Sequence, residues 1–263
     1  RSARVDADSK TAYIAGGSLL GELDHEAMAH GLVTTAGTVS HTGVGGLTLG
    51  GGFGRLARKY GLALDNVKGV DIVTADGKLL HASADENPDL FWAVRGGGGN
   101  FGVVTSFEFE LHPHTRTVFG GDVVFPLKEL PNVLSFYADY AQSAPDELYL
   151  DFFCASELGK EDGVCGLHAC YSGPGSEADM VLAPLQKAGT VINNGIGATD
   201  YVAIQRSWDN TDPRHTGSYL KSGFINEISD NLVNLIVSAD LGEASMDEVL
   251  RVLAPGGTAY VQE

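Results

Sequence analysis

Apolar and polar positions alternate in several stretches of the first half of the chain, as in half-buried β-strands. Residues 11–17 predict a strand that ends in a turn, and residues 67–83 predict two strands joined by Asp76-Gly77. Because Asp-Gly suits a type I′ turn, this pair indicates a hairpin. A further strand is expected over 103–111, with these positions on one face: Val103, Thr105, Phe107, Phe109 and Leu111.

Helical spacing of apolar residues predicts two helices between these strands. Residues 18–31 form an amphipathic pattern, with Ser18 as the expected N-cap and Gly31 as the expected C-cap. A shorter helix is expected over 88–96, where Pro88 suits the first turn. The apolar face of the first helix comprises Leu19, Leu20, Leu23, Ala27 and Met28.

The pattern changes near Pro113, after which glycine is rarer and the units are longer. The alternation of strands and helices predicts an α+β fold, with a boundary between domains 1–113 and 114–263. The expected strands cover 117–125, 147–156 and 163–172, and the expected helices cover 129–142, 175–188, 199–207, 229–240 and 245–253.

Composition narrows the class of protein. The chain has 263 residues, of which 43% are hydrophobic and 19% charged, and its formal net charge is −17. Such acidity disfavours a nucleic-acid partner, because phosphate contacts require a basic face. No apolar run reaches the roughly 18 residues of a membrane span, and no signal peptide is visible. Cytoplasmic and secreted locations both stay open.

The chain contains three cysteines, Cys154, Cys165 and Cys170. An odd number of cysteines in a long chain does not indicate a disulfide framework. We expect them to be small buried hydrophobic residues. A bridge between Cys165 and Cys170 is the alternative.

Glycine occupies seven of the twelve positions in 43–54, "GVGGLTLGGGFG". Glycine allows close approach of a ligand to the main chain, as in phosphate-binding loops. However, the preceding "TTAGTVSHT" is not the buried strand that a nicotinamide-type fingerprint needs, and the Gly-Lys-Ser/Thr of a P-loop is absent. A glycine-rich packing turn is the other interpretation.

Three segments together resemble a known family: "GTVSHTGVGGLTLGGGFGRLARKYGLALDNV", "VDIVTADGKLLHAS" and "PDLFWAVRGGGGNFGVVTSFEFELHP". They are similar to FAD-linked oxidases of the vanillyl-alcohol oxidase type, close to the berberine-bridge-like branch. The resemblance covers residues 10–113 most specifically and continues more weakly, including 218–231. It implies the second lobe of a PCMH-type FAD-binding domain, followed by a substrate domain whose antiparallel sheet carries helices on one face.

The resemblance also implies which residues bind FAD. The loop 38–46 would border the isoalloxazine ring, 50–54 would keep the chain close to the cofactor, and Gly102 and Val103 would meet the adenine. Asp65 and Asn66 would lie beside the cofactor. The expected FAD-binding residues are Thr38, Val39, Ser40, Gly43, Gly45, Gly46, Gly50, Gly51, Gly52, Gly54, Asp65, Asn66, Gly102 and Val103.

Departures from the family pattern bear on how FAD is held. Val39 stands where some relatives carry a flavin-linking cysteine, so a cysteinyl link is excluded. The family's Arg-Gly-Gly-Gly-His stretch and its C-terminal Asn-Tyr pair do not occur. We therefore interpret the chain as the middle part of a longer protein, with an incomplete substrate domain. Made alone, it should purify without colour, and it should dimerise or pair with the missing segments through exposed apolar surface.

Candidate catalytic residues come from the same resemblance. His41 lies in the loop that should face the flavin ring, where it could accept a proton or bind a substrate hydroxyl. Tyr219 and Lys221 would lie on a substrate-domain strand facing the flavin. Packing roles are the alternative for all three. His112 and His114 could share a face of a strand, but no acidic or cysteine partner stands nearby, so no metal is expected.

The resemblance therefore implies an FAD-dependent oxidase that acts on a small alcohol, sugar or secondary-metabolite substrate, with oxygen as acceptor. The alternative is a flavin-free derivative that acts as a binding module, or through another chemistry on the substrate-domain sheet. Flavin absorption of the purified protein would distinguish the two.

Overall fold

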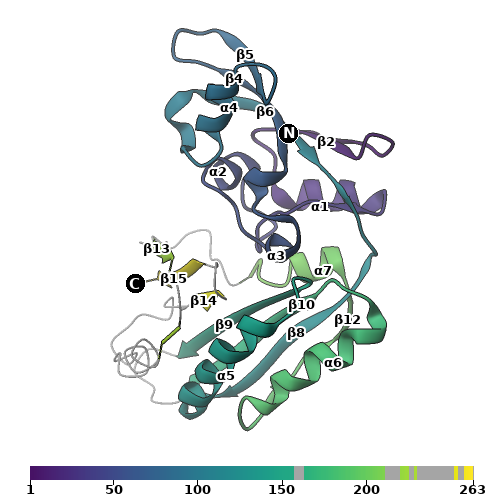
Figure 1. Cartoon of the computed structure of the whole chain (residues 1–263), viewed down its shortest axis with the longest axis vertical. Helices are drawn as coiled ribbons and strands as arrows, with labels where there is room; N and C mark the ends of the chain where they lie inside the picture. Colours follow the sequence, from purple (N-terminus) through teal and green to yellow (C-terminus); the bar gives the residue numbers. More distant parts are fainter. Residues whose placement is uncertain (157–162, 211–219, 225–227, 230–251, 254–257, 263) are drawn as a thin grey trace. The chain divides into compact units, whose positions relative to one another are not determined.

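The computed structural model of the chain describes residues 1–156, 163–210, 220–224, 228–229, 252–253 and 258–262 (Figure 1). The chain divides into two compact units. The first contains Arg1–Thr117 and Asp200–Pro213, and the second contains Val118–Thr199 and Arg214–Glu263. The segment Asp200–Pro213 thus folds with the first unit, although the sequence interpretation places it in 114–263. No helix among the described residues is long and apolar enough to cross a bilayer.

A five-stranded antiparallel sheet in the order β1-β2-β6-β4-β5 forms the first unit. Its core side chains, such as Ile14, Ile72 and Phe107, are almost fully buried. The strands are β1 (Ala3–Asp6), β2 (Thr11–Ala15), β4 (Val67–Val73), β5 (Leu79–Ser83) and β6 (Val103–Glu110).

Short helices and one short strand pair complete this unit. Leu20 and Leu23 of α1 and Phe91 of α4 belong to the same core as the sheet. The helices are α1 (Leu20–Ala29), α2 (Val44–Leu49), α3 (Ala57–Tyr60), η1 (Ala63–Asn66), α4 (Pro88–Val94), η2 (Gly98–Phe101) and α7 (Tyr201–Gln205), and β3 (Leu32–Val33) pairs with β7 (His112–Pro113).

Ser18 is not the N-cap of α1, as the sequence suggested. The helix begins at Leu20, and the Ser18 hydroxyl exchanges hydrogen bonds with the main chain of Ser2. Glu22 caps the helix instead, because its carboxylate accepts the Leu19 N–H at 2.9 Å. The expected C-terminal glycine is found: Gly31 has a φ of +66° and its N–H donates to Met28.

The hairpin over 67–83 is confirmed, but its turn differs from the expected type I′ turn. Gly77 has a φ of +78°, whereas Asp76 keeps a negative φ. The Gly77 N–H donates to Thr74 O at 2.9 Å, which closes an ordinary turn followed by a left-handed glycine. Because β4 ends at Val73 and β5 begins at Leu79, the connection is too long for a two-residue loop.

The face assignment of β6 also differs from the sequence pattern. Val104 is buried, and Val103, which was expected on the same face as Phe107, is 70% exposed. The pairing of β4 with β6 shifts register between Asp71 and Ile72. This bulge reverses which alternate positions face the core.

The second unit contains a six-stranded sheet, in which β8, β9 and β10 pair antiparallel. Its path is β11-β8-β10-β9-β14, with β12 also paired to β8, and β13 pairs separately with β15. The strands are β8 (Thr117–Pro126), β9 (Leu148–Ser156), β10 (Gly163–Tyr171), β11 (Asn193–Asn194), β12 (Gly197–Asp200), β13 (Leu220–Phe224), β14 (Val252–Leu253) and β15 (Thr258–Gln262).

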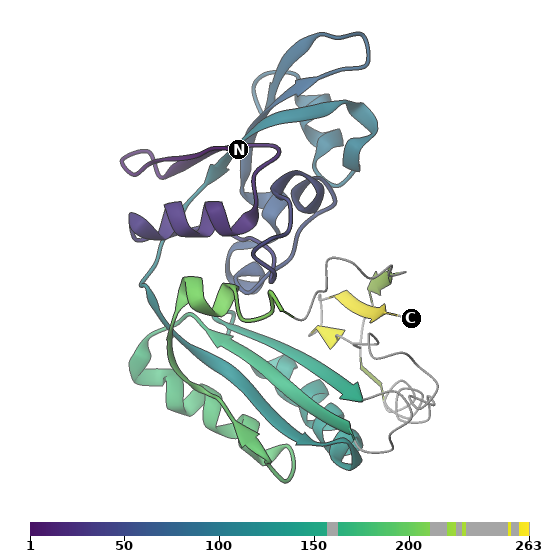
Figure 2. The same cartoon turned by 180° about the vertical axis from the view of Figure 1, so that it is seen from behind.

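Helices of the second unit pack on one face of this sheet, and in the reverse view α5 lies behind the strands (Figure 2). Tyr137 of α5 shares a core with Phe152 and Leu167. This arrangement confirms the expected α+β fold with an antiparallel sheet. The helices are η3 (Leu127–Glu129), α5 (Leu130–Ser143), η4 (Gly175–Glu177), α6 (Ala178–Leu182) and η5 (Ala183–Lys187).

Two helix predictions in this half were inaccurate. The expected helix over 175–188 is divided into η4, α6 and η5, since Pro184 cannot supply an N–H to a continuous helix. Residues 252–253 form β14 rather than the end of a helix. The rest of the helix expected over 245–253, and all but residue 229 of the one over 229–240, lie outside the described residues.

All three cysteines are buried and unbridged, as the hydrophobic interpretation expected. The alternative bridge between Cys165 and Cys170 is wrong. The two residues are five positions apart on β10, so their side chains point to opposite faces of the sheet.

Candidate functional site

The glycine-rich segment 43–54 contains α2, which follows Gly43 and includes Gly46. A Cβ built on Gly43 or on Gly46 would meet no atom within 4 Å, and both residues are exposed. The backbone at these two positions is therefore accessible from outside, with no side chain covering it. Such a surface allows a flat ligand to approach the backbone closely.

Other glycines of the segment leave room for the protein itself. A Cβ on Gly45 would lie 2.9 Å from Gly16 O, and one on Gly54 would lie 1.6 Å from Ala36 O. Gly52 has a φ of +75°, and its Cβ would lie 2.5 Å from a methyl carbon of Leu47. Packing within the protein thus requires glycine at these three positions.

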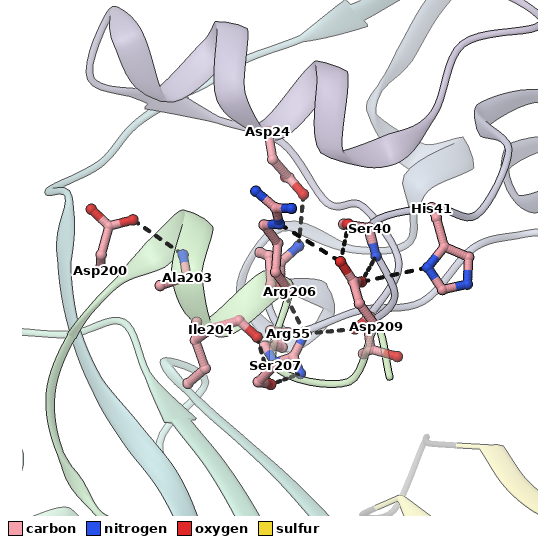
Figure 3. A network of polar contacts seen from close by, with 12 residues as sticks. Asp24, Ser40, His41, Arg55, Asp200, Ala203, Ile204, Arg206, Ser207 and Asp209 are labelled. Carbon is pink, nitrogen blue, oxygen red and sulfur yellow. Dashed lines mark hydrogen bonds and ion pairs between the residues drawn. The ribbon is translucent and has the colours of Figure 1, made fainter. Parts of the chain in front are cut away.

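Asp209, which follows α7, fastens the loop at Ser40 (Figure 3). Its carboxylate accepts the Ser40 N–H at 2.8 Å and the Ser40 hydroxyl at 2.6 Å. His41 Nδ1 lies 3.8 Å from the same carboxylate. Burial raises the pKa of Asp209, but the two hydrogen bonds from Ser40, together with the nearby His41 and Arg206, hold this pKa below its usual range.

A buried arginine ties the same loop to α7 and the residues after it. Arg55 is 2% exposed and donates to Thr38 O and to Gln205 Oε1, both at 3.1 Å. Its other terminal nitrogen donates to the Ser207 hydroxyl at 3.3 Å. The guanidinium therefore joins two segments that are 150 residues apart.

Gln205 extends this network to α1. Its Nε2 donates to Asp24 Oδ2 at 3.2 Å and to Gly37 O at 3.1 Å. Burial raises the pKa of Asp24 to about 7, against the opposing effects of Gln205 and Arg55. Near neutral pH this carboxyl group is thus divided between its protonated and charged forms.

The sequence analysis did not identify these fastening residues. Arg55 stands beside the apolar Leu56 in "GFGRLARK", and this apolar context was the one local signal that Arg55 is buried. No local pattern marks the remaining residues of the network, Asp24, Gln205, Ser207 and Asp209. Three of these lie in the segment that the sequence interpretation assigned to the other domain.

Asp65 and Asn66, expected beside the cofactor, both have partners within the protein. Asp65 accepts the Leu62 N–H at 2.8 Å, and Asn66 donates to Tyr60 O and Leu62 O. The Asn66 carbonyl oxygen lies 2.7 Å from His112 Nε2. These contacts close the 60–66 loop, whatever ligand lies beside it.

His112 and His114 have separate environments. The His112 ring stacks on Tyr60 with centroids 4.1 Å apart, and burial lowers the pKa of this histidine. His114 Nδ1 lies 2.6 Å from Thr115 O. Among the described residues no three His, Cys, Asp or Glu side chains are grouped to hold a metal ion.

Val103 begins β6, and Gly102 directly precedes it. Gly102 has a φ of +147°, and a Cβ there would lie 2.4 Å from Val73 O. The conformation and the packing thus require glycine. Of the expected catalytic residues outside the loop, Lys221 lies on β13, and Tyr219 falls outside the described residues.

Comparison with known proteins bears on the class of this protein. Residues 1–83 match the FAD binding domain family. An FAD-linked oxidoreductase of Dictyostelium discoideum is 35% identical over 91% of this chain and 52% of its own length. The chain is therefore similar to FAD-linked oxidoreductases over most of its own length.

Two solved structures support the same assignment. The 6-hydroxy-D-nicotine oxidase from Arthrobacter nicotinovorans matches with a TM-score of 0.82 and 30% identity, over 90% of this chain and 53% of that one. The carbohydrate oxidase from Microdochium nivale matches with a TM-score of 0.75 and 26% identity, over 94% of this chain and 55% of that one. The chain thus spans about half the length of these relatives.

The cofactor of this family is FAD, and the loop fits a flavin. Gly43 and Gly46 leave the outer side of the loop open, as a ring lying flat against the main chain requires. Ser40 and Thr38 are hydrogen-bonded to Asp209 and Arg55, so these two loop residues have partners within the protein that need no ligand. Val39 carries no nucleophile that could bond the ring.

Proposed function

We propose that this FAD-linked oxidoreductase oxidises a C–OH or C–H group of a small alcohol, sugar or secondary metabolite, with oxygen as acceptor. The observation that carries the proposal is the loop 38–46, which is open at Gly43 and Gly46 and fastened by Asp209. The relatives found by comparison, an FAD-linked oxidoreductase and two oxidases, favour this function over the flavin-free alternative.

Within this proposal, the main chain of 38–46 borders the flavin ring, and Gly50 to Gly54 keep the backbone near it. Gly102 and Val103 contact the adenine, and Asp65 and Asn66 complete the wall. FAD, when bound, supplies the acceptor for the hydride that leaves the substrate carbon. The protein supplies a rigid loop and a proton acceptor.

His41 is our candidate for the proton acceptor. Its Nδ1 lies 3.8 Å from the Asp209 carboxylate, which favours a fixed ring orientation. A histidine held in this way can take the proton of a substrate hydroxyl. Tyr219 and Lys221 remain candidates for substrate contact, in a substrate domain proposed to span 114–263.

We also propose that the first unit pairs with another polypeptide segment or with a second copy. Leu79, Trp92 and Val103 are large apolar side chains with two thirds or more of their surface exposed. Exposed apolar surface of this kind usually marks an interface. Light scattering that shows a strict monomer at high concentration would contradict the pairing.

Titration of the purified protein with FAD, followed by flavin fluorescence, tests the cofactor assignment. We expect saturable binding by the wild type. Gly43→Val and Gly46→Val should weaken it at least tenfold, because each side chain would fill the open side of the loop. Gly197→Val is the matched control, since a Cβ there also meets nothing within 4 Å but lies on β12 of the second unit.

Binding equal to that of the wild type in both loop variants would refute the flavin loop. For the reaction, oxygen consumption by the FAD-loaded protein is measured with panels of alcohols, sugars and amines. A protein that binds FAD but consumes oxygen with none of them would refute the proposed oxidase function.

A further inference from the structure

Cys154 and Cys165 lie directly opposite each other on neighbouring strands of the second unit's sheet. Cys154 belongs to β9 and Cys165 to β10, and the register pairs them within an unbroken run from Gly163 to Tyr171. Both belong to the core that the sheet shares with α5, and they are 2% and 0% exposed. The two thiols therefore point to the same face of the sheet, into the same apolar core.

The pair occupies the kind of position at which antiparallel strands come closest. The Ser172 N–H donates to Glu147 O at 2.9 Å, so these two residues form a hydrogen-bonded pair at the end of the same ladder. Hydrogen-bonded and non-hydrogen-bonded pairs alternate along antiparallel strands, and Cα atoms of the second kind are about 4.5 Å apart. Cys165 precedes Ser172 by seven positions, and Cys154 follows Glu147 by seven. Because this number is odd, the two cysteines form a non-hydrogen-bonded pair.

A disulfide fits this position. Bridged cysteines have Cα atoms about 4.4–6.8 Å apart, a range that includes the spacing of a non-hydrogen-bonded pair. The bond removes two hydrogen atoms and adds no heavy atom, so it does not overpack the core. The contact that it gives up is weak, since the Cys165 thiol donates to Pro126 O at 3.7 Å and a thiol is a poor donor.

Cys170 cannot join either of these cysteines within the folded sheet. It lies opposite Tyr149 on β9 and opposite Gly120 on β8. Its side chain points to the other face of the sheet from Cys165, because the two residues are five positions apart on β10. Of the possible pairings of the three cysteines, the fold therefore allows one.

The folded thiols react poorly, so the bond must form before folding is complete. Burial raises the pKa of Cys165 to about 12, and the thiolate is the form that attacks a disulfide. In the unfolded chain both thiols meet solvent, and their pKa returns to its ordinary value. Only residues 155–164 separate the two cysteines, so closing the loop costs little entropy. Folding then buries the bond and protects it.

We propose that Cys154 and Cys165 form a cross-strand disulfide when the chain folds in an oxidising compartment, and that they remain thiols in a reducing one. The oxidant is a low-molecular-weight disulfide such as glutathione disulfide. One cysteine thiolate attacks it and releases a glutathione thiolate, and the second cysteine then attacks the mixed disulfide and releases the other. The two protein thiols lose two electrons and two protons, and glutathione disulfide becomes two molecules of glutathione. The bond depends neither on flavin nor on the proposed oxidase function.

The bond would connect the two strands close to the connection between them. β9 ends at Ser156 and β10 begins at Gly163, so the cysteine pair lies two positions from each of these ends. A disulfide restricts the unfolded chain and so favours the folded one. The oxidised protein should therefore resist unfolding better than the reduced protein.

Refolding in a glutathione buffer tests the proposal. The reduced 263-residue chain, unfolded in urea, is diluted into buffer with an excess of glutathione disulfide. Its remaining thiols are then blocked with N-ethylmaleimide in denaturant, and the product is digested without reduction. We expect mass spectrometry to find Cys154 linked to Cys165, and Cys170 blocked. In denaturant, Ellman's reagent should detect three thiols before oxidation and one afterwards.

Two variants distinguish this bond from unspecific oxidation. Cys170→Ser should form the same bond, because Cys170 points to the other face of the sheet. Cys165→Ser should form no bond within the chain and should keep both of its remaining thiols. A linked peptide that contains Cys170, or three thiols after oxidative refolding, would overturn the proposal. If the chain precipitates on dilution, the same mapping of protein secreted into the oxidising bacterial periplasm gives the decision.

Urea unfolding tests the stabilising role of the bond. The midpoint of the oxidised wild type should lie at a higher urea concentration than that of the reduced wild type. Cys165→Ser should have the same midpoint in oxidising and reducing buffer. Equal midpoints for the two forms of the wild type would overturn the stabilising role.

Discussion

Asp209 accepts both the main-chain N–H and the hydroxyl of Ser40, at 2.8 and 2.6 Å, across 169 residues of sequence. Through this contact the segment after α7 holds the loop that we assign to the flavin. Replacing Asp209 with alanine should destabilise the protein by about 1–3 kcal/mol, since two hydrogen bonds to a charged group are lost. Urea unfolding measures the loss, and hydrogen exchange at the Ser40 amide should accelerate. Asp85→Ala, at an exposed site, should change neither.

Arg55 should be far more sensitive than an exposed arginine of the same network. Arg55→Leu leaves Thr38 O and Gln205 Oε1 without their buried donor, and such losses cost roughly 3–5 kcal/mol. Arg206 is 67% exposed and lies 3.6 Å from Asp209, so Arg206→Ala should cost at most about 1 kcal/mol. Equal shifts of the unfolding midpoint in the two variants would show that Arg55 does not join the segments.

Asp24 should make stability depend on pH between about 4 and 7. Burial raises its pKa in the folded protein from 3.8 to about 7, so the folded state binds more protons than the unfolded state in this range. The contribution of this group is therefore fully present below pH 4 and is lost as the pH rises through about 7. In the Asp24→Asn variant, the loss of stability that this group causes between about pH 4 and 7 should disappear. Urea midpoints of both proteins at several pH values measure it, and parallel curves would contradict the prediction.

Glycines of the loop should separate into two groups when replaced with alanine. Gly54→Ala places a methyl carbon 1.6 Å from Ala36 O and should destabilise the protein by more than about 3 kcal/mol, as severe overpacking does. Gly43→Ala meets no atom within 4 Å and should stay within about 1 kcal/mol of the wild type. Thermal unfolding compares the two, and a stable Gly54→Ala protein would refute the packing role.

The cysteines should resist thiol reagents in the native protein. Burial raises the pKa of Cys165 to about 12, and Cys154 on the neighbouring strand adds to the effect. Since the thiolate is the reactive form, Ellman's reagent should label none of the three until the protein is unfolded. Rapid labelling of the native protein would show that the second unit opens locally.

Local sequence signals predicted many of the elements correctly. The hairpin over 67–83, the helix after Asn87 and the strands β8, β9 and β10 follow from apolar periodicity and from glycine and proline at their ends. Errors arose where a contact with another segment of the chain overrode the local sequence pattern. The bulge between β4 and β6 reversed the faces at Val103 and Val104, and Ser18 found Ser2 as a partner instead of the helix end.

The sequence by itself located the glycine loop, because residue types at short spacing are read directly, and its resemblance to FAD-linked oxidases indicated the family and the cofactor class. Only the tertiary structure decided which polar groups meet. Asp209 with Ser40, Arg55 with Gln205, and Asp122 with His168 are separated by 169, 150 and 46 residues. Their partners are set by the path of the chain, since a buried polar group must find a hydrogen bond wherever the fold places it.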